Sequence, residues 1–252
     1  MSNLRTLLPP AVPVPLVAGR ACRGPVLIFD LDGTILAVNS FPRWARRLVL
    51  GRFSHLPLSE RAWVAARSAV ALAASRLKIT SHQRLRWRLQ HLWRAAIAGD
   101  GSASETQFQH ELLHHVRPAL RPLLTAVATG RVDAVLATAA AEDYAVGLGR
   151  ALGFTHILAT PATKEPPAAV LPGEVKRQAV TRFLAVRGWQ QRPCVLFTDH
   201  PDDLPLMRMC GTVYWFGTAQ ARRACERLAA GCAIHSPPDG EWAALLASSH
   251  SG

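Results

Sequence analysis

Acidic residues are scarce in this sequence relative to basic ones. Its 252 residues include 17 Asp or Glu against 29 Lys or Arg, which gives a formal net charge of +12. An excess of that size indicates anionic partners, such as phosphorylated metabolites, anionic lipid or nucleic acid. Hydrophobic residues nevertheless make up 49% of the chain, so a disordered or fibrous protein is not expected.

Cysteine is too sparse and too scattered to build a disulfide framework. The five cysteines are odd in number and contain no Cys-x-x-Cys pair, which also argues against a zinc knuckle. We therefore expect buried free thiols and a cytoplasmic location. The cysteines are Cys22, Cys194, Cys210, Cys225 and Cys232.

Long uncharged apolar runs are also missing. A transmembrane helix needs roughly 18 such residues, so a membrane-spanning protein is not expected, although a peripheral position on a membrane surface stays open. The longest run lies near the N-terminus and is interrupted by Pro9, Pro10, Pro13 and Pro15. Because proline breaks the helix that a signal peptide forms, we predict a flexible tail over residues 1–24.

Short apolar runs alternate with helical patterns through most of the chain. Strands are predicted at residues 26–29, 132–138, 156–160, 194–198 and 212–216. Helices are predicted at residues 142–152, 174–187 and 219–229. This alternation predicts an α/β fold with a doubly wound parallel sheet, formed by residues 25–40 and 129–252.

Residues 41–128 contain no convincing strand and are predicted to form a helical cap inserted after the first strand. Ser59 and Ser81 are predicted helix N-caps, and residues 99–101 form a predicted turn. Pro118 and Pro122 indicate a new helix start near the return to the sheet. A cap inserted at this point would lie over the carboxyl edge of the sheet.

The positive charge is concentrated in this predicted cap. Residues 41–99 contain twelve Arg or Lys and one acidic residue, Glu60, which is about +11 of the total +12. An anionic partner is therefore expected to contact the cap. The tryptophans of this region are expected to pack inside the cap, or alternatively to contact a lipid. They are Trp44, Trp63, Trp87 and Trp93.

Two carboxylates follow the first predicted strand, in the segment Asp30-Leu31-Asp32-Gly33-Thr34. Their spacing directs both to the carboxyl edge of the sheet, where open α/β sheets bind ligands. Asp30 can attack phosphorus directly, and Asp32 can protonate a leaving alkoxide and then activate water. Gly33 permits a tight turn and the close approach of a ligand.

A second acidic cluster follows the strand at residues 194–198. Asp199 and Asp203 lie four residues apart across a turn into a helix, and Mg²⁺ prefers such carboxylate oxygens. We expect these two to form a metal site, and Asp202 to lie in the first turn of the following helix. Between the two clusters, Thr138 ends a strand and Lys176 starts a helix, from which it is expected to reach inward toward an anion.

In order and context, these four sites resemble the motifs of the haloacid dehalogenase-like (HAD) superfamily. Asp30-Leu31-Asp32-Gly33-Thr34 matches its Asp-x-Asp-x-Thr motif, and Thr138 matches the hydroxyl residue that follows a later strand. Lys176, preceded by Gly-Glu-Val, matches its lysine, and Asp199 with Asp203 matches its final acidic pair. The resemblance covers about residues 25–217, and the insertion after the first motif is similar to the helical caps of phosphoserine phosphatase-like members.

The resemblance implies a role for each of these residues. Asp30 would be the nucleophile and a Mg²⁺ ligand, and Asp32 would be the general acid/base with its backbone carbonyl facing the metal. Thr138 and Lys176 would bind phosphate. Asp199 would bind Mg²⁺, and Asp203 would support that site. The substrate would be a phosphorylated small molecule or a lipid phosphate.

Two details narrow the implied activity. Residues 36–40 contain none of the acidic side chains that phosphoserine phosphatases use for the substrate amine, so phosphoserine is not expected. Dehalogenases of the superfamily generally lack the second aspartate, so Asp32 argues against dehalogenation.

Several alternatives remain beside a soluble phosphomonoesterase. The basic cap is consistent with a phospholipid head-group phosphatase at a membrane surface. It is also consistent with a nucleic-acid- or membrane-binding protein whose catalytic core is degenerate, although the intact acidic sites argue against degeneration. The sequence contains no recognised nucleic-acid-binding motif, so nucleic acid is not the expected partner. Phosphotransfer to an acceptor other than water is a further possibility.

Overall fold

The computed structural model describes residues 24–100, 102–165, 172–229, 231–237 and 242–247. The predicted N-terminal tail thus lies outside the described residues apart from Gly24, as does Cys22. Cys194, Cys210 and Cys225 are buried free thiols, as expected, and Cys232 is a half-buried one. In the part of the chain that is described, no helix is both long and apolar enough to cross a membrane.

Six parallel strands form one sheet in the order β3-β2-β1-β4-β5-β6. The strands are β1 Val26–Phe29, β2 Ala134–Ala141, β3 Ile157–Thr160, β4 Cys194–Thr198, β5 Thr212–Trp215 and β6 Ala233–His235. The predicted doubly wound parallel sheet is confirmed. Only β6 was not predicted, because its three residues at the sheet margin give too short a pattern to recognise.

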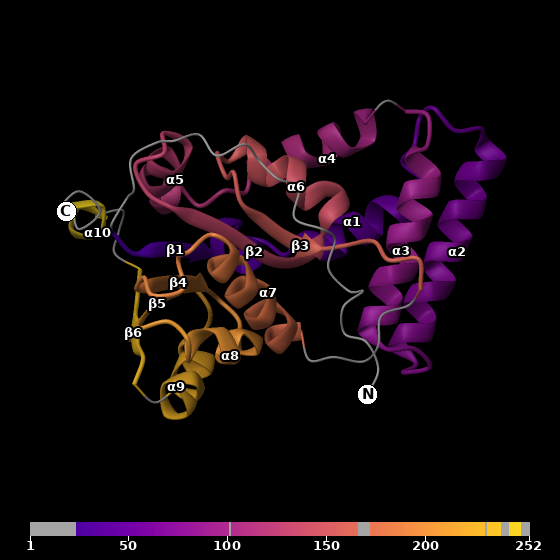
Figure 1. Ribbon diagram of the computed structural model, residues 1–252. Coiled ribbons are helices and arrows are strands. Elements are labelled where there is room, and N and C mark those ends of the chain that lie inside the picture. Colours follow the sequence, from indigo (N-terminus) through magenta and orange to yellow (C-terminus); the bar gives the residue numbers. More distant parts are fainter. Residues whose placement is uncertain (1–23, 101, 166–171, 230, 238–241, 248–252) are drawn as a thin grey trace.

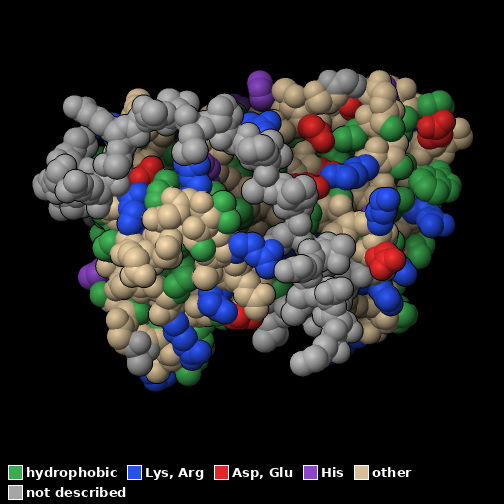
Figure 2. All heavy atoms as spheres, in the orientation of Figure 1, with side chains coloured by type: hydrophobic (Ala, Val, Ile, Leu, Met, Phe, Trp, Pro, Cys, Tyr) green, Lys and Arg blue, Asp and Glu red, His purple; other side chains and the backbone are tan. Residues whose placement is uncertain are grey.

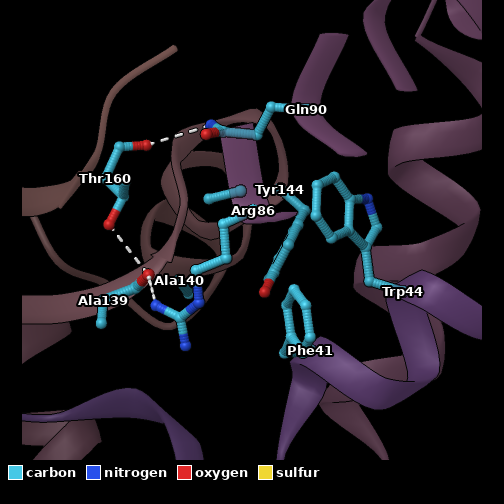
Figure 3. Close-up of a pocket in the computed structure, with 9 residues that line it drawn as sticks. Phe41, Trp44, Arg86, Gln90, Ala139, Ala140, Tyr144 and Thr160 are labelled. Carbon is cyan, nitrogen blue, oxygen red and sulfur yellow. Dashed lines mark hydrogen bonds between the residues drawn. The ribbon is translucent and has the colours of Figure 1, made fainter. Parts of the chain in front are cut away.

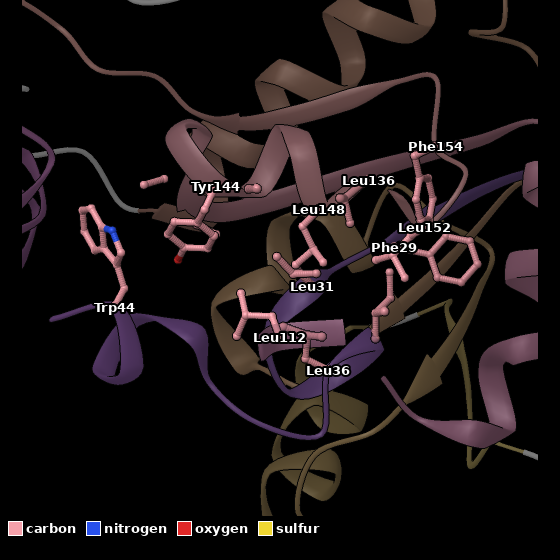
Figure 4. Close-up of a cluster of buried hydrophobic side chains, with 14 of the residues drawn as sticks. Phe29, Leu31, Leu36, Trp44, Leu112, Leu136, Tyr144, Leu148, Leu152 and Phe154 are labelled. Atoms are coloured by element: carbon pink, nitrogen blue, oxygen red, sulfur yellow. The ribbon is translucent and has the colours of Figure 1, made fainter. Parts of the chain in front are cut away.

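The sequence of β1 explains its central place. All four of its residues are buried, because the strand lies between β2 and β4 and both of its faces are covered. Leu27 and Phe29 belong to the core on one face, whereas Val26 and Ile28 belong to the core on the other, as the two-residue period of a strand requires. Figure 4 shows the first of these cores, in which Phe29 lies beside Phe154.

Helices cover both faces of the sheet. They are α5 Arg121–Ala128, α6 Glu142–Ala151, α7 Pro172–Val186, α8 Leu204–Met207, α9 Ala219–Leu228 and α10 Ala243–Ala247. Figure 1 shows α5 and α6 on one side of the strands and α7, α8 and α9 on the other. The predicted helix start at residues 118–122 is confirmed, since a short 3-10 turn begins at Pro118 and Pro122 lies in the first turn of α5.

Four helices that precede α5 in the segment between β1 and β2 correspond to the predicted helical cap. They are α1 Ser40–Val49, α2 Leu58–Arg76, α3 His82–Ile97 and α4 Ala103–Leu113. Figure 1 places α1, α2 and α3 beyond the carboxyl ends of the strands, with α2 outermost. Figure 1 also shows α5 beside the strands, far from α2, and the division of the chain at residue 128 stays a prediction.

One expectation for the cap is corrected, and another is confirmed. Ser81 caps α3 as predicted, with its side chain accepting from the Arg84 amide, but Ser59 lies inside α2. That helix starts earlier because Pro57, whose fixed φ suits a helix start, occupies its N-cap position. Trp44 is buried and its ring lies 5.9 Å from that of Trp93, so Trp44 packs inside the cap and is not a lipid contact.

Candidate active site

The loop that follows β1 brings Asp30 and Asp32 to the carboxyl edge of the sheet. The Asp30 amide donates to the Phe197 carbonyl of β4 at 2.9 Å, which continues the strand pairing as far as this residue. Gly33 then adopts φ of 71°, and a Cβ at this position would overlap the carboxylate of Asp199. Glycine is therefore required for the two acidic loops to approach each other.

Lys176, in the first turns of α7, joins the two acidic loops. Its Nζ lies 2.9 Å from Asp30 Oδ1 and 2.8 Å from Asp203 Oδ1; the two aspartates are buried, and the Lys176 side chain is 11% exposed. Burial lowers the pKa of Lys176, but the two carboxylates outweigh burial and raise the pKa above its ordinary value. The inward reach predicted for Lys176 is thus present, and in this structure it meets carboxylates.

The single lysine does not fully offset the buried negative charge. Burial raises the pKa of Asp30 to about 7, and repulsion from Asp203 and Asp32 adds to this effect, while Lys176 opposes it. Burial also raises the pKa of Asp199. These carboxylates therefore favour a further positive charge beside them.

Asp32 is held by the first residue of α1. The amide of Ser40 donates to Asp32 Oδ1 at 2.8 Å, and its hydroxyl donates to Oδ2 at 3.0 Å. The hydroxyl of Tyr144, on α6, lies 2.7 Å from that of Ser40 and donates to it, since Ser40 has a single hydroxyl hydrogen. Burial raises the pKa of Asp32 above its ordinary value, although the two hydrogen bonds from Ser40 act in the opposite direction. A raised pKa favours the protonated form, which can act as a general acid.

Two threonines hold the second acidic pair, Thr198 at the end of β4 and Thr34 in the loop after β1. Thr198 Oγ1 donates to Asp203 Oδ2 at 2.6 Å, and Thr34 Oγ1 donates to Asp199 Oδ1 at 3.4 Å. Asp202 points away with an exposed carboxylate, in the first turn of a short 3-10 helix, as expected.

Thr138 lies level with the acidic loops, although it does not end its strand as predicted, because β2 continues to Ala141. Leu136 of β2 pairs with Phe29 of β1, so Thr138 is two residues beyond the end of that pairing, level with the loop of Asp30. Its side chain is buried and its hydroxyl oxygen accepts from the Ala140 amide at 3.0 Å. The register thus brings Thr138 to the edge that carries both acidic loops.

The acidic loops bring carboxylates together without a full set of metal-ligating side chains. Within the described ranges, no three His, Cys, Asp or Glu side chains are grouped closely enough to hold an ion. Lys176 occupies the space between Asp30 and Asp203. The donors nonetheless fit Mg²⁺ in chemistry, because Asp30 is a buried and Asp199 a half-buried carboxylate, and a hard cation would lower their raised pKa values.

The cap closes over this edge through α3. A cavity of about 10 Å³, room for roughly one water, lies between α1, α3 and the end of β2. Figure 3 shows Arg86 and Gln90 pointing from α3 toward β2 and β3. Arg86 donates to the Ala139 carbonyl at 2.7 Å and Gln90 to the Thr160 carbonyl at 3.2 Å, and the charge of Arg86 opposes the rise in the pKa of Asp32.

The sequence pattern did not single out several residues of this site. Thr34 lies in the motif that begins at Asp30, Thr198 precedes Asp199, and Ser40 follows the helix-capping Asn39. These positions next to the predicted acidic residues could have indicated hydrogen bonds to them. Tyr144 and Arg86 carry no such signal, because they are distant in sequence and only the packing of α6 and α3 brings them here.

Comparison with known proteins adds three findings. Residues 27–208 match the family model for haloacid dehalogenase-like hydrolases. A Mycobacterium tuberculosis protein named "Probable phosphatase" is 28% identical over 197 residues, which are 73% of this chain. The chain spans 65% of the length of that relative.

Solved structures resemble this one in fold. A protein of unknown function from Bordetella pertussis Tohama I has a TM-score of 0.63 at 16% identity, covering 85% of this chain and 99% of its own. The unliganded probable phosphoserine phosphatase from Vibrio cholerae has a TM-score of 0.56 at 14% identity, covering 90% of this chain and 66% of its own. At these identities the likeness concerns the fold alone.

Proposed function

The chain belongs to the haloacid dehalogenase-like hydrolase family, and we propose that it is a Mg²⁺-dependent phosphomonoester hydrolase with Asp30 as its nucleophile. One observation carries the proposal. The Asp30 carboxylate lies at the end of β1, 2.9 Å from the Lys176 ammonium, and a second carboxylate, Asp32, is fixed by hydrogen bonds two residues further on. This arrangement combines a nucleophile, a cation for phosphate and a proton donor.

The reaction proceeds in two displacements. A carboxylate oxygen of Asp30 attacks phosphorus, the bond to the ester oxygen breaks, and Asp32 donates a proton to the departing alkoxide. Asp32 then accepts a proton from water, which attacks the phosphorus of the aspartyl-phosphate. Breakage of the bond between phosphorus and Asp30 releases inorganic phosphate and restores both carboxylates to their starting states.

The neighbouring residues prepare this chemistry. Lys176 favours the ionised, nucleophilic form of Asp30 and would attract the phosphate oxygens. Thr138 would supply its hydroxyl to the same oxygens, since the sheet register brings it level with Asp30. Ser40 orients Asp32 through two hydrogen bonds, so the proton is delivered from a fixed position.

Mg²⁺ would be held by Asp30, by the backbone carbonyl of Asp32 and by Asp199, with Asp203 supporting the site. When bound, it would offset the repulsion between the carboxylates and the incoming phosphate. Gly33 would keep the two acidic loops close enough to share one ion, because any side chain at that position would overlap Asp199.

The substrate is proposed as a phosphate monoester other than phosphoserine. The basis is that no acidic residue occurs at residues 36–40 to bind a substrate amine. A lipid phosphate is the second candidate, and the concentration of positive charge in residues 41–99 favours it. Transfer of the phosphoryl group to an acceptor other than water would begin with the same attack of Asp30 on phosphorus.

A phosphate-release screen tests the proposal. Purified protein would be incubated with phosphorylated metabolites and lipid phosphates, with Mg²⁺ and with a chelator, and Asp30→Asn would serve as the blank. We expect Mg²⁺-dependent release from at least one class that is lost in the variant. Release that survives in the variant would contradict the role of Asp30, and no release from any class would leave the basic binding protein as the better description.

A further inference from the structure

The solvent-facing side of α2 is mainly apolar, and the polar residues exposed on the helix are Ser59, Glu60, Arg67 and Arg76. Trp63, Val70 and Leu77 follow one another at intervals of seven residues, which places them on one face of the helix, and they are 51%, 66% and 71% exposed. Four alanines fill the same exposed face. They are Ala62, Ala66, Ala69 and Ala73.

The opposite side of α2 is mainly apolar as well, and its one buried polar residue, Ser68, donates to the Val64 carbonyl. Val64, Ser68 and Ala71 are buried there, where the helix packs on α1 and α3. Surface helices normally pair one apolar face with one polar face, and a helix that is apolar all round is normally covered all round. The outer face of α2 therefore has the composition of a contact surface.

Basic side chains border this face. Arg67 places its guanidinium 5.3 Å from the centre of the Trp63 ring, and Arg76 and Lys78 lie at the end of the helix beside Ile79, which is 71% exposed. Figure 2 shows hydrophobic and basic side chains, with acidic ones among them, along the right side of the molecule, where Figure 1 places α2. Glu60 is the single acidic residue of residues 41–99.

The positive charge around the outer face of α2 favours one kind of partner over another. Two copies meeting through this face would bring together Arg67, Arg76 and Lys78 of each copy against a single acidic residue, Glu60, and the repulsion disfavours a homodimer. An anionic surface gains from the same charge. The face is also a convex helix with protruding Trp, Val and Leu side chains, which a soft bilayer accepts without a matching groove, whereas a protein partner would have to supply one.

We propose that the outer face of α2, formed by Trp63, Val70 and Leu77 with Arg67 and Arg76, docks on the surface of an anionic phospholipid bilayer. The apolar side chains enter the boundary between head groups and acyl chains, and the arginines remain at the level of the lipid phosphates. Helix α2 lies flat on the surface and spans roughly 28 Å of it.

Docking through α2 uses none of the proposed catalytic residues. Figure 1 shows α3 between α2 and the sheet, and Arg86 and Gln90 extend from α3 toward the strands. The inference therefore stands or falls separately from the proposed hydrolase activity, and variants of α2 are expected to leave the turnover of a water-soluble phosphate ester unchanged.

Vesicle co-sedimentation of the full chain tests the docking surface. Vesicles of phosphatidylcholine mixed with phosphatidylglycerol are compared with vesicles of phosphatidylcholine alone, at low and at high salt. The double variant Val70→Asp, Leu77→Asp is compared with Val186→Asp, because Val186 is 71% exposed at the end of α7, on the core side of the molecule. Circular dichroism establishes that all variants keep the fold.

We expect the wild-type protein and Val186→Asp to pellet with the anionic vesicles at low salt and to be released as salt screens the charges. The double variant should partition roughly tenfold or more weakly, since two apolar anchors are replaced by charges that the bilayer repels. Three results would overturn the inference. They are no pelleting of the wild-type protein, equal pelleting of the double variant, and a wild-type dimer in sedimentation analysis that Val70→Asp dissociates.

Discussion

The hydroxyl groups of Ser40 and Tyr144 lie 2.7 Å apart, and this contact joins α1 to α6 beside Asp32, the proposed proton donor. Ser40 is the first residue of α1 in the cap, whereas Tyr144 belongs to α6 beside the sheet. The same Ser40 hydroxyl donates to Asp32 Oδ2 at 3.0 Å. The orientation of Asp32 therefore depends on the packing of two elements about 100 residues apart.

Ser40→Ala should lower kcat by roughly tenfold for an alkyl phosphate, because it removes a hydrogen bond to a carboxylate. An activated aryl phosphate should lose less, because its leaving group needs less protonation. Tyr144→Phe, which keeps the ring that packs 5.7 Å from Trp44, should show a smaller loss with the same pattern. A rise in KM alone, with kcat unchanged, would show that Ser40 binds substrate and does not position Asp32.

Asp32→Asn should retain part of the activity while losing most with poor leaving groups. General acid/base assistance is worth about 10² to 10⁴ in rate, and the amide can supply none of it. The measurement is kcat/KM for a series of phosphate esters ordered by the pKa of the leaving group. Equal losses for aryl and alkyl esters would contradict the assignment of Asp32 as the proton donor.

The sequence predicted the layout of the molecule and the residues at the sheet edge with few exceptions. A central strand of a parallel sheet is covered on both faces, so all of its residues are apolar, as in residues 26–29. Such a continuous apolar run is easy to recognise in the sequence. The acidic loops follow those strands directly, so parallel packing was enough to gather Asp30 and Asp199 at one edge. The cap gave a weaker signal, and α2 began before its predicted Ser59.

Contacts between distant elements could not be predicted in the same way. Nothing local indicates that Lys176 would bridge Asp30 and Asp203, because that depends on where α7 begins relative to two loops. Arg86 is one of twelve cations in residues 41–99, and only the docking of α3 on Ala139 distinguishes it. The apolar outer face of α2 could likewise not be predicted, because the sequence does not show which side of this helix is buried.

Lys176→Met should lower the free energy of unfolding by about 3 kcal/mol or more, because it leaves two buried carboxylates without their cation. Urea denaturation in the absence of divalent ions measures the loss, and Lys164→Met, at an exposed lysine, is the matched control with no expected change. Adding Asp30→Asn to Lys176→Met should restore part of the stability. No recovery in the double variant would mean that the Asp30–Lys176 contact contributes little.

Mg²⁺ should raise the melting temperature of the wild-type protein, since an ion that binds only the folded state stabilises it in proportion to the logarithm of its concentration. Asp199→Asn should remove this dependence, because it deletes a proposed ligand. Asp202→Asn, whose carboxylate is exposed on the same loop, should keep it. A Mg²⁺-dependent shift that persists unchanged in Asp199→Asn would place the ion elsewhere.

The central claim is that Asp30 takes the phosphoryl group from the substrate. Asp30→Asn tests it most directly, because the amide has nearly the same shape but is a far poorer nucleophile. Circular dichroism should show an intact fold, and Mg²⁺-dependent phosphate release from the best substrate of the screen should fall by about a thousandfold or more. Phosphate release by folded Asp30→Asn at close to the wild-type rate would contradict the account.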